Sequence, residues 1–472
     1  MTGAVTSAPA MVAVDLGAES CRVSLLQWKG GGPEIRMVHR FANGPVAEGA
    51  HLRWDLVRIC RELERGLRLC AETETEGIAS LGVTGWGVDY VRLGPERRPR
   101  SQPFCYRDAR NARAMEQAHA IISAPDLYSR TGVQVQALNT VYQLYADRLD
   151  GVPETPWVQL PEYILHWLGA PRVAEWTNAT HTGLVDPETR QWSGDLFSAL
   201  GLDRRAAPEI VAPGTEIGAM RGELARLPAF AHTRLIAPAC HDTASAVAGI
   251  PGGAGPWAYI SSGTWSLVGA PIAGTIRTPE AFAHGFTNLG AADGKILFHR
   301  GVAGMWLLQQ CINTWSKDRA WSVSELVAEA QHLPAPDEPL DLNDPAFVAP
   351  GDMPARINAQ RRQRGLAALA VSADGAPQTA NLIFHSLACC YGDTLRAMER
   401  LTGQRAQRIC VVGGGSRNGC LNALTETAIG IPVEACSAES STLGNFAVQG
   451  AASEGGGVAD YARRLAHATI QS

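Results

Sequence analysis

Two stretches of the chain, one in each half, share one pattern of apolar runs around a short polar turn. Residues 11–26 place apolar and β-branched positions on both sides of the small-residue turn 17–20, and residues 257–268 do the same around the hydroxyl-rich turn 261–264. This arrangement predicts a strand, a tight turn and a second strand. We therefore expect a β-hairpin at the start of each half.

Helical spacing follows each hairpin. Behind a possible capping residue, Asp55, apolar residues recur three and four positions apart at Leu56, Ile59, Leu63 and Leu67. A similar stripe further along comprises Ile383, Leu387, Cys390 and Met398. An amphipathic helix must bury one face to be stable, so these stripes indicate core packing. Strands interleaved with helices in both halves predict an α/β protein with helices packed against sheets.

The length of the chain predicts more than one domain. At 472 residues it exceeds the size at which a single hydrophobic core keeps growing. The Pro- and Gly-rich residues 251–256 are typical of a linker, which places a domain boundary near residue 250. Residues 333–365, dense in Pro, Asp and Arg, are interpreted as a long surface excursion.

Composition narrows the class of protein. Hydrophobic residues make up 46% and charged residues 18%, as in ordinary globular proteins. The formal charge of -5 provides no broad positive field, so we expect no nucleic acid partner. The short run Arg361, Arg362 and Arg364 is interpreted as a solvated face.

Cysteine usage and the first residues indicate a cytoplasmic protein. The eleven cysteines are scattered without a CxxC pair, so we expect neither a disulfide scaffold nor a four-cysteine zinc site. Residues 1–10 contain no Lys or Arg and no signal-type apolar core, and no segment approaches the ~20 apolar residues that span a bilayer. We therefore expect no contact with a membrane.

The two turns are suited to phosphate chemistry. Binding a triphosphate requires close backbone N–H groups, hydroxyl donors and a carboxylate-held metal. Small residues at 17–20 and 261–264 allow that approach, and Asp15 at a strand end could orient Mg²⁺ through water. Each turn taken alone could be merely a tight hairpin, but one in each half favours a shared function.

A third glycine-rich turn follows the apolar run 409–412. Residues 413–415 are three glycines that expose bare backbone to a ligand ahead of a predicted helix through Leu421 and Leu424. Neither GxGxxG nor GxxxxGK[ST] occurs in the chain, which removes the usual support for a Rossmann or P-loop site. The segment around Ser416 narrowly misses the hydrolase pattern GxSxG, because Asn418 takes its last position.

The candidate base for a substrate hydroxyl is Asp242. It lies where polar residues interrupt small apolar ones, with His241 and Thr243 beside it as possible hydrogen-bond partners of a polyol. Asp242 could instead only cap the following helix, and the segment alone leaves both interpretations open. Trp86, flanked by Gly85 and Gly87, is suited to stacking on a sugar face, with plain packing as the alternative.

These segments together resemble a known family. Residues 15–17, 241–243, 261–266 and 413–415 occur in the order seen in the FGGY carbohydrate kinases. Further segments resemble the rhamnulokinase branch of that family, namely residues 86–89, 106–108, 139–144, 177–180, 306–309 and 441–445. The resemblance covers the chain from about residue 12 to residue 447.

The resemblance implies a fold and a reaction. The fold would be α/β, with two actin-like, ribonuclease-H-like domains and the active site in the cleft between them. Residues 11–249 would form the sugar-binding domain and residues 250–455 the nucleotide-binding domain. The reaction would move the γ-phosphoryl group of ATP, with Mg²⁺, to the C1 hydroxyl of a ketose such as L-rhamnulose. The partner would be this small sugar, and the protein a monomer or homodimer.

The resemblance also implies roles for individual residues. Asp242 would accept the proton, and Gly87, His241, Asp242 and Thr243 would contact the sugar. Asp15 would hold the magnesium ion through water. The nucleotide would be contacted from both halves by Ala18, Glu19, Ser20, Cys21, Arg22, Thr264, Gln309 and Gly414.

Three departures from the family pattern bear on the substrate. Gly301 stands where an Asn that contacts the sugar is expected, Cys21 where a Gly is usual, and Thr84-Gly85 where Asp-Thr is usual. A lost polar contact can change sugar preference by orders of magnitude. L-Fuculose, L-ribulose or another deoxyketose therefore remains an alternative substrate.

Two hypotheses from other classes of protein compete with the kinase hypothesis. An actin-like ATP-driven switch would phosphorylate no sugar, and it would need no hydroxyl-activating carboxylate such as Asp242. A serine hydrolase using Ser416 would need a base and an orienting acid that no local motif supplies.

Overall fold

Both predicted hairpins are present in the computed structural model, which describes residues 9–30, 32–252 and 255–471. Strand β1 (Ala10–Leu16) pairs antiparallel with β2 (Ser20–Lys29), and β15 (Trp257–Ser262) pairs antiparallel with β16 (Trp265–Ile272). The hairpin predictions are therefore confirmed. Most of residues 1–10, which were predicted to contain no signal sequence, and part of the predicted linker at 251–256 lie outside the described residues.

Each hairpin belongs to a sheet built on the same plan. The first sheet has the order β13 (Thr215–Ala219), β14 (Arg234–Ala237), β6 (Ile78–Gly85), β1, β2, β3 (Gly32–Ala42), β21 (Thr469–Gln471). The second has the order β17 (Phe286–Gly290), β18 (Ile296–Ala303), β16, β15, β19 (Arg408–Val412), β20 (Val433–Ala435). In both, the hairpin and its neighbour are antiparallel, and two parallel strands follow beyond the first strand of the hairpin. This duplication confirms the prediction of two ribonuclease-H-like units.

The predicted helices form where the apolar stripes occur. Helix α1 (Leu56–Thr73) begins after Asp55, whose Oδ1 accepts the backbone N–H of Arg58 at 2.9 Å, and all four predicted stripe residues are buried. Helix α13 (Ala376–Thr402) buries its stripe except for Cys390, which is half-buried. The other helices used below are α3 (Ala124–Thr131), α5 (Leu160–Trp167), α6 (Trp176–Thr180), α8 (Asp242–Ala248), α10 (Trp306–Trp315), α12 (Met353–Gln363), α14 (Gly419–Ile429), α15 (Ser440–Glu454) and α16 (Val458–Leu465).

The predicted surface excursion at 333–365 is wrong in part. Helix α12 lies within it, and the side chains of Met353 and Ile357 are completely buried in the core of the second half. These two apolar residues, one helical turn apart, lie on the same face of the helix and pack together into this core. The surrounding Pro, Asp and Arg residues hid this signal in the sequence.

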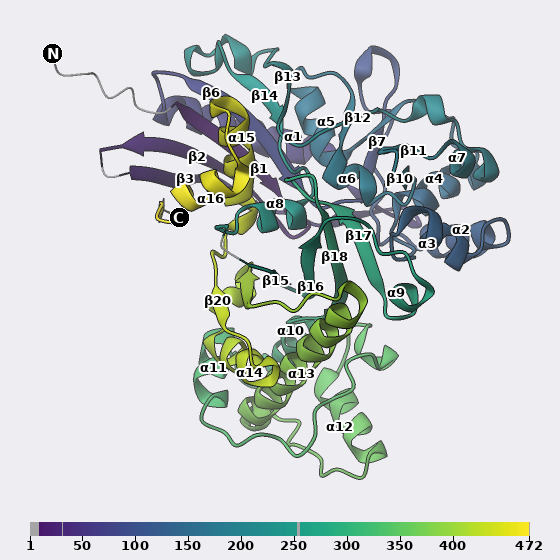
Figure 1. Cartoon of the computed structure of the whole chain (residues 1–472), viewed down its shortest axis with the longest axis vertical. Helices are drawn as coiled ribbons and strands as arrows, with labels where there is room; N and C mark the ends of the chain where they lie inside the picture. Colours follow the sequence, from purple (N-terminus) through teal and green to yellow (C-terminus); the bar gives the residue numbers. More distant parts are fainter. Residues whose placement is uncertain (1–8, 31, 253–254, 472) are drawn as a thin grey trace.

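The end of the chain packs on the first sheet. Helices α15 and α16 lie on the face formed by Met11, Leu26 and Ile35, where Phe446 and Leu465 are buried against them. Strand β21 then pairs parallel with β3. Figure 1 shows these last elements, in yellow, beside the purple first sheet. The domain bounds 11–249 and 250–455 remain a prediction. In the structure, residues 440–471 pack back onto the sheet of the first half.

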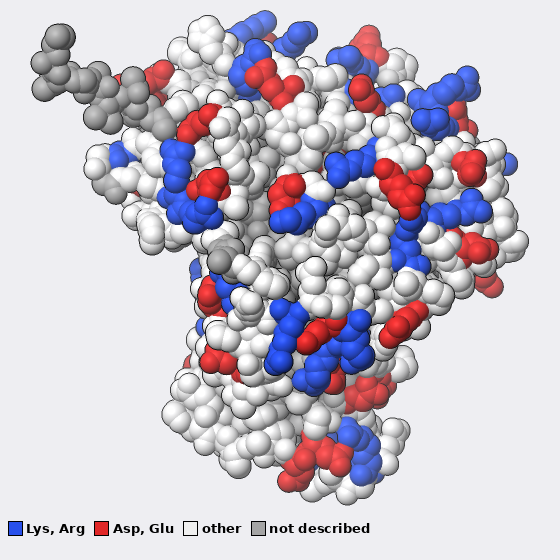
Figure 2. Space-filling view, in the orientation of Figure 1, with Lys and Arg blue, Asp and Glu red and all other residues white. Residues whose placement is uncertain are grey.

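The two halves touch at more than one place. One continuous hydrophobic cluster includes Tyr128 and Trp176 of the first half with Phe286 of β17 in the second. Elsewhere α8 crosses α15, and the Ser245 hydroxyl donates to the carbonyl of Ser441 at 2.7 Å. On the face drawn in Figure 2, acidic and basic side chains are interspersed. Among the described residues, no helix has the length and apolar character needed to cross a membrane.

Candidate active site

The carboxyl ends of three parallel strands bring the two predicted acids to one edge of the first sheet. Strands β14, β6 and β1 are neighbours, and Asp15 near the end of β1 pairs with Thr84 of β6. The next residue, Gly85, forms a bridge with His241, directly before Asp242. Ligands of α/β sheets bind at this edge, because the loops that follow the strands meet there. We call it the site edge.

Asp15 is held by charged and hydroxyl groups. Its Oδ2 accepts hydrogen bonds from Arg22 Nη1 at 3.0 Å and from the Ser441 hydroxyl at 2.6 Å. Arg22 Nη1 also lies 3.1 Å from a carboxylate oxygen of Glu439. Burial raises the pKa of Asp15, Arg22 and Ser441 lower it, and the charge of Asp242 raises it further. Asp242 therefore lies close enough to affect the ionisation of Asp15.

Asp242 opens toward solvent, whereas Asp15 does not. The Asp242 side chain is 38% exposed, compared with 6% for Asp15. Protein still surrounds the carboxyl on its other sides, and this desolvation raises its pKa to about 6. The residue that caps α8 is His241, not Asp242. The interpretation of Asp242 as merely the helix cap is therefore wrong.

The predicted sugar-contacting residues meet beside Asp242. The Thr243 hydroxyl lies 3.3 Å from Asp242 Oδ1, and His241 Nε2 lies 3.5 Å from the same oxygen. A Cβ atom added to Gly87 would lie 2.5 Å from His181 Nδ1 and 3.1 Å from His241 Cδ2. Burial lowers the pKa of His241 to about 4, so this imidazole is neutral at pH 7. The structure thus brings together Gly87, His241, Asp242 and Thr243.

Trp86 packs inside the first half. Its ring lies 4.4 Å, centroid to centroid, from that of Trp54, and both indole N–H groups donate to Asp89 Oδ2. Its exposed fraction is 6%. The packing alternative for Trp86 therefore describes this structure, and the sugar-stacking interpretation has no exposed ring face to use.

The first turn presents only some of its predicted nucleotide contacts. Ala18 and Ser20 are half-buried, Glu19 is exposed, and Arg22 points toward Asp15. Cys21 differs: its side chain is fully buried in the core of the first half, which raises the pKa of its thiol to about 12. Only the backbone of Cys21 can face a ligand, because strand alternation turns its side chain inward.

In the second half, three segments meet at the turn between β15 and β16. The backbone N–H groups of Met305 and Trp306, at the start of α10, donate to the carbonyls of Gly263 and Thr264 at 3.0 Å each. A Cβ atom added to Gly415 would lie 2.0 Å from the Ser262 hydroxyl oxygen. The glycine turn, the hairpin turn and α10 therefore lie together. These three segments carry the predicted nucleotide contacts Thr264, Gln309 and Gly414, which are all at least partly exposed.

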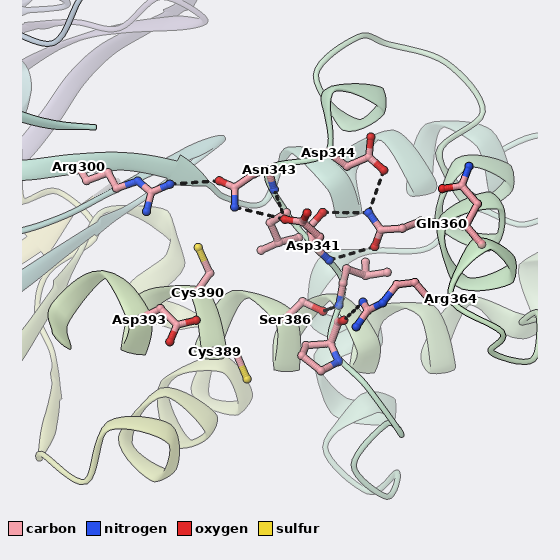
Figure 3. A pocket seen from close by; sticks show the side chains of 14 residues that line it. Arg300, Asp341, Asn343, Asp344, Gln360, Arg364, Ser386, Cys389, Cys390 and Asp393 are labelled. Atoms are coloured by element: carbon pink, nitrogen blue, oxygen red, sulfur yellow. Dashed lines mark hydrogen bonds between the residues drawn. The ribbon is translucent and has the colours of Figure 1, made fainter. Parts of the chain in front are cut away.

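Gly301 lies on the exposed face of β18. It pairs with Leu267 of β16, and the nearest atom to an added Cβ would be Leu267 Cδ2 at 3.6 Å. The neighbouring residue, Arg300, points to the opposite face of the sheet, as strand alternation requires. There it lines a cavity of about 600 Å³ between α13 and residues 339–344, and its guanidinium donates to Asn343 Oδ1 (Figure 3). None of the predicted site residues lines this cavity.

Sequence reasoning missed several residues that shape the site. Glu439 and Ser441 reach Asp15 from the far end of the chain. Glu175 is completely buried behind the Asp242 segment, and this burial raises its pKa to about 8. Ser416 lacks the hydrolase partners: its carbonyl accepts a hydrogen bond from Asn422 Nδ2 at 3.0 Å, and among the described residues no histidine or carboxylate hydrogen-bonds its hydroxyl. No local pattern marked these contacts, since each joins segments distant in sequence.

The fold and the site define the class of actin-like two-domain proteins. The two halves are duplicated ribonuclease-H-like units, with acidic residues at the strand ends of one half and a glycine turn in the other. Within that class, the chain belongs to the FGGY family of carbohydrate kinases. The model of the family's N-terminal domain matches residues 10–249, and that of its C-terminal domain matches residues 258–453. The chain is therefore a carbohydrate kinase.

Individual relatives agree with this assignment. The chain is 35% identical over 446 residues to a rhamnulokinase of Enterococcus faecalis, covering 93% of this chain and 88% of the relative. It is 34% identical over 443 residues to a rhamnulokinase of Bacteroides thetaiotaomicron, covering 93% and 89%.

Solved structures show the same fold. A ligand-bound xylulose kinase from Lactobacillus acidophilus superimposes with a TM-score of 0.78 at 15% identity, covering 97% of this chain and 92% of that one. A Plasmodium falciparum glycerol kinase with ADP gives a TM-score of 0.73 at 14% identity, covering 98% and 94%.

Proposed function

We propose that this carbohydrate kinase phosphorylates the C1 hydroxyl of a ketose, with L-rhamnulose as the first candidate. The hydroxyl oxygen forms a bond to the γ-phosphorus of MgATP, the bond to the bridging oxygen breaks, and ADP leaves. Asp242 takes the hydroxyl proton. The observation that carries this proposal is the Asp242 carboxylate, open to solvent at the site edge among residues that suit a polyol.

The environment of Asp242 suits a general base. A pKa of about 6 leaves the carboxylate ionised at neutral pH, yet makes it more basic than an ordinary aspartate. The Thr243 hydroxyl and the neutral imidazole of His241 provide hydrogen-bond partners for sugar hydroxyls. Gly87 packs closely against His181 and His241, so a side chain at this position would displace the two imidazoles. These groups can orient the sugar with one hydroxyl at Asp242.

The residues present fit a magnesium nucleotide. Mg²⁺ in kinases is held by one or two carboxylates together with phosphates and water. The site edge matches this need, since Asp15 offers a carboxylate whose Oδ1 is free of the two bonds made by Oδ2. Within the described ranges there is no cluster of three or more metal-ligating side chains. The ion would neutralise charge on the phosphates.

The protein contacts of the nucleotide come from both halves. In the first half we assign the backbone of residues 18–21 and the guanidinium of Arg22. In the second we assign Thr264, Gln309 and Gly414, which surround one exposed turn. Small residues at both turns allow backbone N–H groups to approach phosphate oxygens closely.

The choice of L-rhamnulose rests on the rhamnulokinase relatives. Gly301 leaves open L-fuculose or L-ribulose, because no side chain at this position reaches the sugar. A coupled ADP-release assay with MgATP across ketoses, deoxyketoses and polyols tests the proposal. We expect sugar-dependent ADP release, with the highest kcat/KM for a ketose. ADP release that no sugar changes would instead identify an ATP-driven switch.

The role of Asp242 is tested with a matched pair of variants. Asp242→Ala should lower phosphoryl transfer at least ~10²-fold while ATP binding persists, because the base is lost. Asp126→Ala removes an exposed aspartate on α3, away from the site edge, and should leave transfer unchanged. Equal activity of the two variants would exclude Asp242 as the base.

A further inference from the structure

A buried carboxyl group lies behind the segment that carries Asp242. Glu175 and Thr177 are completely buried, at the start of α6. Oε2 of Glu175 accepts the Thr177 hydroxyl at 2.5 Å and the backbone N–H of Cys240 at 2.8 Å. Oε1 accepts the backbone N–H of Thr177 at 2.9 Å. Glu175 therefore holds the backbone two residues before Asp242.

Thr177 extends this chain to the next residue. A threonine hydroxyl has one proton, and here that proton is donated to Glu175. The hydroxyl oxygen is then free to accept the backbone N–H of His241, at 3.2 Å. Two consecutive amides, those of Cys240 and His241, are thus fixed by Glu175 and Thr177. A buried N–H that loses its hydrogen-bond partner is unfavourable, so these bonds define the path of the segment.

The helix that carries Thr177 is also fixed to the second half. The Thr180 hydroxyl, at the other end of α6, accepts the backbone N–H of Gly290 in β17 at 2.9 Å. Trp176, at the start of α6, packs in the same hydrophobic cluster as Phe286 of that strand. Helix α6 therefore connects the segment before Asp242 with the sheet of the nucleotide half.

We propose that Glu175 and Thr177 are positioning residues, which set the location of the Asp242 carboxylate through the backbone of Cys240 and His241. This inference rests on the proposed function, because it assigns Asp242 as the base. Neither residue has exposed surface with which to contact the sugar or the nucleotide. A misplacement of the base by about 1 Å can lower the rate ~10²-fold, so a small shift of this segment is enough to affect catalysis.

Two substitutions at one position separate positioning from stability. Thr177→Val keeps the shape of the side chain but loses the hydroxyl, so both of its hydrogen bonds disappear. Thr177→Ser keeps the hydroxyl. As a matched control, Thr233→Val removes an equally buried hydroxyl, which donates to the carbonyl of Ile78 at 2.6 Å. Thr233 precedes β14, at the end of that strand opposite the site edge.

The assays measure rate and backbone protection. We expect Thr177→Val to lower kcat about 10- to 100-fold with the KM for ATP unchanged, and Thr177→Ser and Thr233→Val to stay within about threefold of the unsubstituted protein. Amide hydrogen exchange of Cys240 and His241 should accelerate in Thr177→Val and not in Thr233→Val. If Thr177→Val does not accumulate as folded protein, Thr177→Ala replaces it in both assays.

The outcomes separate this inference from the proposed function. Full kcat together with normal exchange protection at Cys240 and His241 in Thr177→Val or Thr177→Ala would overturn the positioning role. A protein that phosphorylates no sugar would instead refute the proposed function. In that case the exchange measurement still decides whether Glu175 and Thr177 hold the segment.

Discussion

Arg22 Nη1 donates a 3.0 Å hydrogen bond to Asp15 Oδ2, joining the two strands of the first hairpin at the site edge. The same nitrogen lies 3.1 Å from Glu439, more than 400 positions later in the chain. One cation thus balances two carboxylates that would otherwise repel each other. Without it, burial and the neighbouring charge of Asp242 would favour a protonated, neutral Asp15.

Replacing Arg22 should therefore impair metal use most strongly in acid. Arg22→Met removes the positive charge that lowers the pKa of Asp15, so a larger fraction of this carboxyl is protonated. We expect the concentration of Mg²⁺ needed for half-maximal activity to rise at least ~5-fold at pH 6.5 and less at pH 8, since one pKa unit corresponds to a tenfold change. Arg36→Met, at an exposed position of the same sheet, is the control. An increase that is equal at both pH values would contradict the electrostatic explanation.

The pH dependence of activity should follow Asp242. Because its pKa is raised to about 6, kcat/KM should fall as the pH decreases through about 6, with a slope of one proton. The measurement is kcat/KM for the best ketose between pH 5 and pH 8. An acid limb near pH 4, the ordinary range of aspartate, would show that desolvation does not act on the reacting carboxylate.

Ionisation of Asp242 should lower the stability of the fold, although it raises the activity. The pKa of Asp242 is about 6 in the folded state and near 3.8 in the unfolded chain, so the folded state binds the carboxyl proton more tightly. The free energy of unfolding therefore decreases as the pH rises from 3.8 to about 6. Asp242→Asn should raise the melting temperature above pH 6 and leave it unchanged below about pH 3.8. A lower melting temperature of the variant at pH 7.5 would mean that the ionised carboxylate stabilises the fold.

The close approach of Gly415 to Ser262 predicts a contrast between two glycines. Gly415→Ala would place a Cβ atom 2.0 Å from the Ser262 hydroxyl oxygen, so the glycine turn must move. We expect a loss of about 1–3 kcal/mol in stability and a KM for ATP raised at least ~10-fold. Gly419→Ala, at the start of α14 with no atom within 4 Å of its Cβ, should be neutral or stabilise by up to ~1 kcal/mol. Thermal unfolding and ATP kinetics measure both.

Restoring a polar side chain at position 301 should change sugar preference. The space beside Gly301 is open, so Gly301→Asn should fold normally. If the missing amide contacts the sugar, kcat/KM for L-rhamnulose should rise ~10-fold while the KM for ATP is kept. The measurement is kcat/KM for each sugar of the panel, with Gly301→Asn and with the unsubstituted protein. An unchanged ranking of the sugars would show that position 301 does not contact the substrate.

Local pattern was sufficient for the elements that begin each half. The hairpins at 11–26 and 257–268 and the helix behind Asp55 were predicted correctly, because turns, caps and apolar periodicity act over a few residues. Local pattern was insufficient for α12, whose large buried apolar residues, Met353 and Ile357, stand among polar ones. Arg361 of the same helix is also buried, so the interpretation of the arginine run as a solvated face is wrong for this residue. Local pattern also did not reveal that the Cys21 side chain turns into the core, or that Trp86 packs against Trp54.

By itself, the sequence determined the α/β class, the two similar halves and the segments that carry the chemistry, since these depend on residue type and spacing. Only the tertiary structure decided which distant residues complete the site. Ser441 reaches Asp15 because α15 folds back on the first sheet, and Glu175, directly before α6, reaches the backbone of Cys240, 65 positions later in the chain. Such contacts depend on how whole elements pack, and neighbouring residues along the chain carry little information about that packing.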